Sequence, residues 1–355
     1  MNILIYGAGA VGGYLGARLA QQKHNVTLIA REVMAKLVGE TGLEVTEGNK
    51  RILTRPQAVT SVAQAFKDGQ TYDLIILAMK AYDIANAINP LIAFCPQPNM
   101  ILTTQNGIGI EKGLVKQFGA EHVMAGSFTL PIRKETTTQL VAERTDGGIC
   151  LAPTQPKQEI KQWAALFKNT GMETKIYKDY ESMKWSKALL NIIANASSAI
   201  LNRRPGLVYR SDLIFDLEIK MLQEALAVMK AAGYKVVDLP AVPATKLAFS
   251  VQRLPRTLLK PGLSKLVADG RGDKMPSFHI DLTAGKGKSE VVYHNGAIAK
   301  VGKEHGIATP VNAALTDILW KLTLEKLDWR EFNGKPSRLV QEVKRYEAAF
   351  GGGGR

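Results

Sequence analysis

The chain has few cysteines and no recognisable metal-ligand pattern among its 355 residues. Its two cysteines, Cys95 and Cys150, form no Cys-x-x-Cys pair, so we expect no disulfide framework and a reducing cytoplasm as the location. The five histidines show neither His-x-x-x-His nor His–Cys spacing, so we expect no metal site. These shortages argue against a disulfide-stapled secreted domain and against a zinc module.

Long apolar runs are also missing. None approaches the ~18–20 residues that a membrane-spanning helix needs. The N-terminal MNILIYGAG is an apolar strand that enters a glycine turn without a basic leader, so a signal peptide is not expected. With 46% hydrophobic and 22% charged residues, the composition is typical of a globular protein with a sizeable core, and the length suggests two domains.

Acidic residues are outnumbered, which leaves a formal net charge of +14. Such a charge can attract nucleic acid, an anionic membrane or an anionic small ligand. The densest basic stretch, residues 253–274, has no aromatic residue for base stacking and matches no nucleic-acid-binding module, so a solvated face is the preferred interpretation. Its six basic residues stand against Asp269 and Asp273, a net of +4, and are Arg253, Arg256, Lys260, Lys265, Arg271 and Lys274.

Glycines are concentrated in a turn near the start of the chain. Residues 2–6 (NILIY) are predicted to form a strand, and Gly-x-Gly-x-x-Gly, a helix and a second strand (VTLIA) follow within about 30 residues. In this setting Gly7 permits a tight turn, Gly9 lets the backbone approach a pyrophosphate, and Gly12 allows close helix–strand packing. The helix N-terminus offers backbone N–H groups to the phosphates. The predicted dinucleotide contacts are Gly7, Ala8, Gly9, Ala10, Val11 and Gly12.

Polar residues follow the predicted strands of this first half. Arg31 ends the second strand, where a guanidinium suits a ribose 2′-phosphate, although Glu32 in its place would favour NAD. Lys80 and Asn106 end two later strands and are expected to point to the crevice at the carboxyl edge of the sheet. The alternatives are a solvated lysine and an Asn-Gly turn residue.

The remaining pattern predicts further strands and then helices. Residues 121–152 are expected to complete the sheet, and a helix and a last strand follow, so we place the domain boundary near residue 178. The helices expected after it span 181–201, 211–232, 280–304 and 309–326, within a second domain at 179–350. Residues 238–276 form a basic, proline- and glycine-bearing connection with a short helix, and 351–355 (GGGGR) a disordered tail.

One predicted helix carries polar residues at four-residue steps. In KWSKALLNIIAN, residues 184–195, the side chains of Lys187, Asn191 and Asn195 fall on one face, while leucines and isoleucines fill the others. A helix that is apolar nearly all round is buried, so these polar groups are expected to line an internal site. The alternative is a polar seam whose partners are neighbouring backbone groups.

Together these motifs resemble the ketopantoate reductases (2-dehydropantoate 2-reductases), NADPH-dependent enzymes of pantothenate synthesis, over nearly the whole chain. The matching pieces are GAGAVGGYLGARLA, Arg31, LAMKAYD, QNGIG, KWSKALLNIIAN and SEVVYHNGAIAKVGKEHGIATPVN. The resemblance implies a Rossmann-type NADP-binding domain, residues 1–178, followed by an all-α domain like that of 6-phosphogluconate dehydrogenase. The implied reaction is reduction of 2-dehydropantoate to pantoate, on the way to pantothenate and coenzyme A.

The resemblance also implies a role for each matching residue. Lys187 would be the general acid. The family's late glutamate falls on Glu290, which we expect to orient Lys187 or the substrate hydroxyl; the alternative is an ordinary acidic residue at a helix N-terminus. The flanking Lys184 lies off the four-residue stripe and is expected to matter far less. The implied substrate contacts are Asn106, Asn191, Asn195 and Ser277, and the implied 2′-phosphate contacts are Arg31 and Lys80.

Three departures from the family pattern concern the substrate pocket. The run from Ser277 to Glu290 is one residue longer than is common, residues 240–275 are longer than in short members, and 203–206 read RRPG where some members have another asparagine. These departures leave a reductase of another branched 2-oxo acid as one alternative. A non-catalytic NADP(H)-binding redox sensor is the other, although the presence of Lys187, Asn191, Asn195 and Glu290 argues against it. The 238–276 connection is expected to act as a lid or homodimer contact, or to be a surface insertion without a role. No nucleic-acid or membrane partner is expected.

Overall fold

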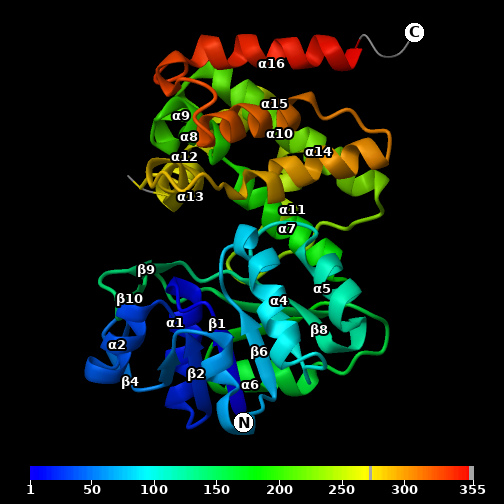
Figure 1. The fold of residues 1–355 in the computed structure, drawn as a ribbon. Coiled ribbons are helices and arrows are strands. Elements are labelled where there is room, and N and C mark those ends of the chain that lie inside the picture. Colours follow the sequence, from blue (N-terminus) through cyan, green and yellow to red (C-terminus); the bar gives the residue numbers. More distant parts are fainter. Residues whose placement is uncertain (272–273, 352–355) are drawn as a thin grey trace. The chain divides into compact units, whose positions relative to one another are not determined.

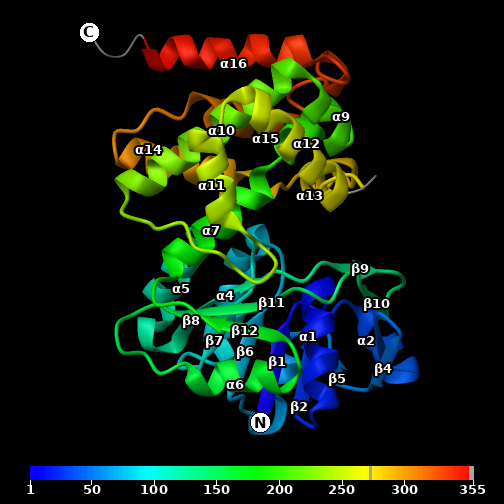
Figure 2. The same ribbon diagram turned by 180° about the vertical axis from the view of Figure 1, so that it is seen from behind.

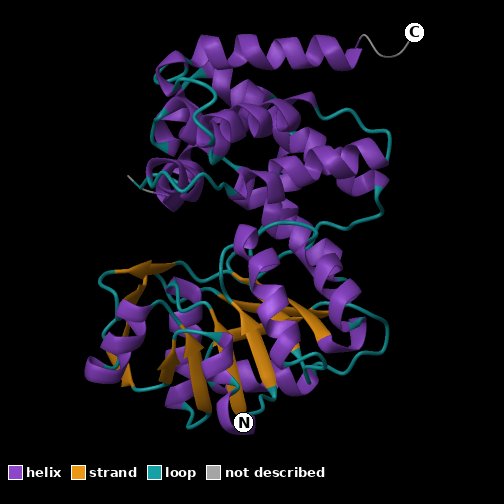
Figure 3. Cartoon of the chain, in the orientation of Figure 1, coloured by secondary structure: helices purple, strands orange, loops and turns teal. Residues whose placement is uncertain are grey.

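The computed structural model describes residues 1–271 and 274–351 (Figure 1). The chain divides into two compact units, the first made of Met1–Lys184 with Leu239–Val242 and the second of Trp185–Asp238 with the described residues from Pro243 onward. All assigned strands lie in the first unit and the second is helical (Figure 3), which confirms the predicted fold class. Of the predicted disordered tail, residues 352–355 lie outside the described residues.

The first unit is built on an eight-stranded sheet with the order β12-β11-β8-β7-β6-β1-β2-β5. Strands β5, β2, β1, β6, β7 and β8 run parallel, β11 is antiparallel to β8, and β12 is parallel to β11. The order reverses between β1 and β6, and ligands of open α/β sheets bind at the carboxyl ends of the strands at such a switch point. The strands are β1 (Asn2–Tyr6), β2 (Asn25–Ile29), β5 (Gln57–Val59), β6 (Leu74–Leu77), β7 (Ile101–Thr103), β8 (Val123–Phe128), β11 (Gly148–Pro153) and β12 (Glu173–Ile176).

Helices cover both faces of this sheet (Figures 1 and 2). Side chains of α1 and α6 share one buried apolar cluster with the strands, including Leu15, Trp163 and Phe167. Helices α4 and α5 lie on the other face, nearer the viewer in Figure 1. The helices of this unit are α1 (Ala10–Gln21), α2 (Glu32–Thr41), α3 (Val62–Ala65), α4 (Ile84–Phe94), α5 (Ile110–Phe118) and α6 (Lys161–Asn169), with 3-10 turns η1 (Lys67–Gly69), η2 (Ala81–Asp83) and η3 (Ala120–His122).

A second, four-stranded sheet has the order β4-β3-β10-β9. Its strands are β3 (Leu43–Glu47), β4 (Lys50–Thr54), β9 (Ile132–Lys134) and β10 (Gln139–Ala142). The prediction that residues 121–152 complete the main sheet was therefore half wrong, because only β8 and β11 join it. The small sheet packs on α1, since a Cβ placed on Gly13 would come within 2.9 Å of the Leu140 side chain. The strand propensity of β9 and β10 does not specify which strands they pair with, whereas the packing of the small sheet on α1 does.

The second unit consists of helices, several of which differ from their predicted extents. The expected helices over 211–232 and 309–326 are confirmed as α10 and α15, whereas the expected 280–304 helix is three separate elements and a final helix was not predicted. Helix α7 (Tyr180–Ile192) begins in the first unit. The others are α8 (Ala196–Leu201), α9 (Pro205–Arg210), α10 (Asp212–Ala231), α11 (Ala244–Arg253), α12 (Arg256–Arg271), α13 (Ser277–Thr283), η4 (Glu290–Tyr293), α14 (Asn295–Glu304), α15 (Pro310–Thr323), η5 (Trp329–Glu331) and α16 (Pro336–Gly351).

The predicted 181–201 helix is broken between α7 and α8 by a buried carboxylate. Glu218 of α10 is fully buried, and its oxygens accept hydrogen bonds from the Ala194 backbone N–H (2.8 Å), the Ser197 hydroxyl (2.5 Å) and the Tyr209 hydroxyl (3.0 Å). Ala194 has a φ of 48°, in the left-handed region that side chains other than glycine seldom adopt. A hydrogen bond to the carboxylate thus replaces the helical bond of Ala194, which a helical sequence pattern cannot reveal.

Candidate functional site

The glycine turn between β1 and α1 has the geometry that a phosphate-binding backbone requires. Gly7 has a φ of 107°, and a Cβ there would lie 2.7 Å from the Met79 nitrogen, two residues after β6. A Cβ on Gly12 would lie 2.0 Å from the Gly7 carbonyl oxygen, so both positions exclude a side chain. Around Gly9 nothing lies within 4 Å of the Cβ position. Gly7 and Gly12 are therefore needed by the fold, whereas the open space at Gly9 is available to a ligand.

Helix α1 begins at this turn without the usual side-chain cap. Its N-cap residue, Gly9, has no side chain to accept a hydrogen bond, and the first turn carries no acidic residue. The backbone N–H groups and the positive end of the helix dipole are therefore not offset by a local anion. The residues present thus fit the pyrophosphate of a dinucleotide, including Ala8, Ala10 and Val11, which complete the turn.

Arg31 and Lys80 lie near the switch point but slightly beyond their strands. Strand β2 ends at Ile29, and Arg31 is the exposed N-cap residue of α2. Strand β6 ends at Leu77, and the half-buried Lys80 precedes η2. Because β1 lies between β2 and β6, both cations follow strands adjacent to the glycine turn. Glu32 is exposed as the first residue of α2.

Lys134 on β9 is a cation near this edge that sequence reasoning missed. In the β-ladder it lies opposite Leu140, so both side chains project from the sheet face that packs on α1. Lys134 is exposed, and partial desolvation lowers its pKa, which the charge of Arg31 lowers further. Two cations that repel each other favour an anion beside them. No sequence signal marked Lys134, because β9 pairs outside the main sheet.

Asn106 follows β7 in a tight turn whose backbone is held by buried groups. Gly107 has a φ of 107°, and Asn106 itself is exposed. The preceding Gln105 is buried; its amide nitrogen donates to the carbonyl oxygens of Leu77 (2.7 Å) and Met79 (3.2 Å). The Gln105 side chain thus connects the segments after β7 and β6 by hydrogen bonds, and these segments carry Asn106 and Lys80.

In the helical unit, the structure brings three of the predicted substrate residues together. The Asn195 amide nitrogen donates to the Asn191 carbonyl oxygen (3.0 Å) and to the Ser277 hydroxyl (3.3 Å). The Asn195 side-chain oxygen accepts from the Phe278 backbone N–H (3.1 Å) at the start of α13. Asn195 therefore adjoins Asn191 although it lies beyond the helix break, so the prediction of one continuous helical face was wrong while the grouping is present.

Asn191 carries an unused donor beside this group. Its side-chain nitrogen is buried and has no hydrogen-bond partner among the described residues. Leaving such a group unpaired costs about 1–3 kcal/mol, which a polar ligand or an ordered water would relieve. Lys187 lies one turn before Asn191 on α7 and is half-buried. Asn191 and Lys187 thus share one side of α7, as predicted.

Glu290 and the late sequence block prove to be embedded in helix packing. Glu290 is buried at the start of η4. In HGIATPVN, the Asn312 amide donates to the carboxylate of Glu224 (2.7 Å), which also accepts from the Val311 and Asn312 backbone N–H groups at the start of α15. Burial raises the pKa of Glu224, although these hydrogen bonds oppose the shift. Glu224 thus caps the start of α15 and the Asn312 amide holds its carboxylate, so the block that carried much of the resemblance is partly structural.

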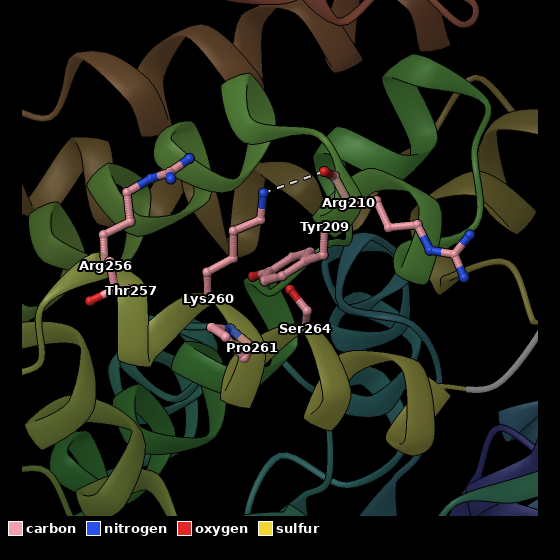
Figure 4. A pocket seen from close by; sticks show the side chains of 7 residues that line it. All are labelled: Tyr209, Arg210, Arg256, Thr257, Lys260, Pro261 and Ser264. Atoms are coloured by element: carbon pink, nitrogen blue, oxygen red, sulfur yellow. Dashed lines mark hydrogen bonds between the residues drawn. The ribbon is translucent and has the colours of Figure 1, made fainter.

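The basic 238–276 connection contains α11 and α12 rather than one short helix. A pocket of about 380 Å³ is lined by Tyr209, Arg210, Arg256, Thr257, Lys260, Pro261 and Ser264 (Figure 4). Two of its three cations have acidic partners: the Arg256 guanidinium contacts Asp216 at 2.7 Å, and the Lys260 ammonium lies 2.5 Å from Asp212. Two of the six basic residues of the 253–274 stretch are therefore neutralised locally, which favours the solvated-face interpretation.

Neither a metal cluster nor a membrane-spanning element emerges from the part of the chain that the structure describes. Within residues 1–271 and 274–351, no group of three or more histidine, cysteine or acidic side chains is placed to hold a metal ion. No helix in these ranges is long and apolar enough to cross a membrane. Among the described residues, neither Cys95 nor Cys150 takes part in a disulfide.

Comparison with known proteins identifies matches to both parts of the chain. The family model described as "Ketopantoate reductase PanE/ApbA" matches residues 3–155, and "Ketopantoate reductase PanE/ApbA C terminal" matches 179–322. The 2-dehydropantoate 2-reductase of Pyrococcus horikoshii is 26% identical over 332 residues, covering 92% of this chain and 97% of the relative. That of Caulobacter vibrioides is 26% identical over 322 residues, covering 90% and 98%.

Solved structures share the fold at lower identity. A PanE/ApbA family ketopantoate reductase from Ralstonia eutropha aligns with a TM-score of 0.76 and 24% identity over 92% of this chain and 99% of its own. A D-mandelate dehydrogenase in ternary complex with NADH and anilino(oxo)acetate aligns with a TM-score of 0.76 and 21% identity, over 91% and 98%. Identities this low support the fold of this chain and not its substrate.

Proposed function

The chain belongs to the ketopantoate reductase family, and on that premise we propose that it is an oxidoreductase that uses NADPH to reduce 2-dehydropantoate to pantoate. This reaction would serve the synthesis of pantothenate and coenzyme A. The observation that carries the proposal is the match of family models to both units, with relatives named 2-dehydropantoate 2-reductase covering 92% and 90% of the chain.

The first unit is proposed to bind the nicotinamide dinucleotide. The open position at Gly9 and the uncapped N-terminus of α1 support a pyrophosphate there. The D-mandelate dehydrogenase neighbours, whose structures contain NADH, are consistent with a cofactor of this class. NADPH, when bound, would supply the hydride. Asn106 is proposed to contact both cofactor and substrate.

The second unit is proposed to supply the proton and the substrate contacts. Lys187 would donate a proton to the alkoxide oxygen that forms from the ketone, and a positioned acid of this kind typically contributes ~10²–10⁴-fold. Ser277 and Asn195 would bind the substrate carboxylate, and the unpaired Asn191 nitrogen would donate to a substrate oxygen. Glu290 would orient Lys187 or the substrate hydroxyl. A cation aimed at developing negative charge is the arrangement that this chemistry requires.

Arg31 and Lys80, with Lys134, support a preference for NADPH over NADH. Replacing Arg31 with alanine should weaken NADPH by ~1–3 kcal/mol, the value of a charge-assisted hydrogen bond, and NADH far less. Lys134→Ala should shift the ratio of the two dissociation constants in the same direction by a smaller factor. Arg133→Ala is the matched control, because this neighbouring cation lies opposite Val141 on the other face and pairs with Glu135. Equal losses for both cofactors in Arg31→Ala would contradict the 2′-phosphate assignment.

The deciding experiment is an NADPH-oxidation assay with purified protein and a panel of 2-oxo acids. We expect 2-dehydropantoate to give the highest kcat/KM. A higher value for another branched 2-oxo acid would shift the substrate assignment and leave the chemistry intact. Tight NADPH binding without turnover of any member would instead favour the redox-sensor alternative.

A further inference from the structure

A buried ion pair links α7 to α5 outside the groups assigned so far. The Lys184 ammonium lies 2.8 Å from the Glu111 carboxylate, and the two side chains are 2% and 1% exposed. A buried pair is weak evidence for stability, because the cost of removing two charges from water consumes most of their attraction. Stability alone therefore gives little reason for this pair, and its other contacts indicate what it does.

The pair is hydrogen-bonded to the turn that carries Asn106. The Lys184 ammonium donates to the Gln105 carbonyl oxygen at 2.9 Å. The Thr103 hydroxyl donates to the same Glu111 carboxylate oxygen at 2.7 Å, so Glu111 is oriented by β7 itself. The ion pair therefore contacts Thr103 and Gln105, and Gln105 immediately precedes Asn106.

The peptide bond transmits this contact to Asn106. The Gln105 carbonyl and the Asn106 N–H belong to one planar peptide group. A cation bound to that carbonyl oxygen therefore restrains the orientation of the whole peptide group, including the Asn106 nitrogen. Gly107, with its φ of 107°, follows directly and adds no side chain that could restrain the turn from the other end. The restraint on Asn106 therefore comes from the Gln105 side, through Lys184 and the Gln105 side chain.

We propose that Lys184 and Glu111 are positioning residues that set the peptide plane before Asn106 and thereby the orientation of its side chain towards the ligand. The ligand contact of Asn106 is part of the proposed function, and the inference rests on it. The two lysines of KWSK thus have different proposed roles. Lys184 acts within the first unit through Asn106, whereas Lys187 is the proposed general acid.

Lys184→Met tests the proposal, because methionine fills a similar volume without charge. We expect kcat/KM for the 2-oxo acid to fall ~10–100-fold, as misplacement of a contact by about 1 Å does, while NADPH still binds. The same substitution in an Asn106→Ala background should cost little more, because the residue through which Lys184 acts is gone. The uncompensated Glu111 carboxylate lowers the melting temperature under either hypothesis, so the kinetic cycle decides: a purely structural role would leave the two substitutions additive in kcat/KM.

The control is the neighbouring, less buried pair between the same two helices. Lys112 of α5 lies 3.1 Å from Glu181 of α7, with 59% of the Lys112 side chain exposed. Lys112→Met should leave kcat/KM unchanged. If Lys184→Met does not fold, the double variant Lys184→Met/Glu111→Gln takes its place in the comparison with Asn106→Ala. This variant removes both charges, so no buried ion is left uncompensated.

A crystal structure of the folded Lys184 variant separates failure of this inference from failure of the proposed function. The inference expects a rotated Gln105 carbonyl and a displaced Asn106, whatever substrate the protein takes. An unmoved turn, or additive losses in the cycle, overturns it. Lack of turnover by the unmodified protein with every 2-oxo acid would reject the proposed function, and the displaced turn would still decide the positioning role.

Discussion

The two units build their proposed binding groups in different ways. In the first, the proposed binding groups at the glycine turn are backbone N–H groups. Glycine is needed at Gly7 and Gly12 because a Cβ at either position would collide with neighbouring main-chain atoms. In the second, the groups are side chains on α7 and at the start of α8 and α13, and Glu218 stabilises the helix break beside them.

This difference teaches which substitutions each unit can tolerate. A backbone site is disrupted when a substitution adds a Cβ where the main chain and the ligand are in close contact. A side-chain site is altered by removing an atom that donates a proton or a hydrogen bond. Substitutions at the glycine turn should therefore affect fold and cofactor affinity, whereas substitutions at functional side chains in the second unit should affect turnover before they affect stability.

The largest expected effect tests the side-chain half of this comparison. Lys187→Ala should lower kcat by ~10²–10⁴-fold, because the proposed proton donor is lost. The dissociation constant for NADPH and the melting temperature should stay close to those of the unmodified protein, because Lys187 is only half-buried. Steady-state kinetics, cofactor titration and a thermal melt measure the three quantities. A variant that keeps its kcat would remove Lys187 from the reaction.

Two glycine substitutions test the backbone half. Gly12→Ala should both destabilise the protein and abolish tight NADPH binding, since its Cβ would lie 2.0 Å from the Gly7 oxygen and overpacking costs about 1–3 kcal/mol or more. Gly9→Ala should weaken NADPH binding with little change in melting temperature, because no protein atom lies within 4 Å of the new Cβ. If Gly9→Ala binds NADPH normally, the pyrophosphate does not approach this turn.

Glu218→Gln sharpens the comparison within the helical unit. An amide has one acceptor oxygen in place of two, so either the Ser197 hydroxyl or the Ala194 N–H with the Tyr209 hydroxyl should face an NH2 group where it had an acceptor. One unsatisfied buried donor costs about 1–3 kcal/mol, which urea unfolding would measure. We expect kcat to fall as well, because Asn195 directly follows Ala194. Unchanged stability would show that the break at 193–195 does not depend on this carboxylate.

The smallest effect is expected from the basic connection. Changing Arg253, Arg256, Lys260 and Lys265 together to glutamine should leave kcat/KM within about twofold, because exposed ion pairs contribute little and are screened by salt. Lys260 and Arg256 lower the pKa of the exposed Asp212 carboxyl, so any stability from this cluster exists above the ordinary carboxyl pKa and is lost as the pH falls through the lowered one. A large fall in kcat/KM that salt removes would instead support substrate steering, and concentration-dependent activity would support a homodimer contact.

Local sequence patterns determined much of the first unit. Gly7, Gly9 and Gly12 follow an apolar strand, and only a tight turn into a helix accommodates that order of residue types, so the turn was predictable without the fold. The identity of Lys187 and Asn191 as neighbours on one helical face followed from the 3.6-residue period alone. Family resemblance added Ser277, whose place beside Asn195 no spacing indicates.

Only the tertiary structure decided which distant groups meet. The carboxylate that breaks α7 from α8 comes from Glu218, more than 20 residues away, and the lysine that restrains the Asn106 turn is Lys184, 79 positions from its partner Gln105. Strand β10 could have joined the main sheet and instead pairs with β3. The physical reason is common to the three cases: a local pattern specifies which face of an element is apolar, whereas the partner of a buried charge or a strand edge is chosen by packing among elements far apart in the chain.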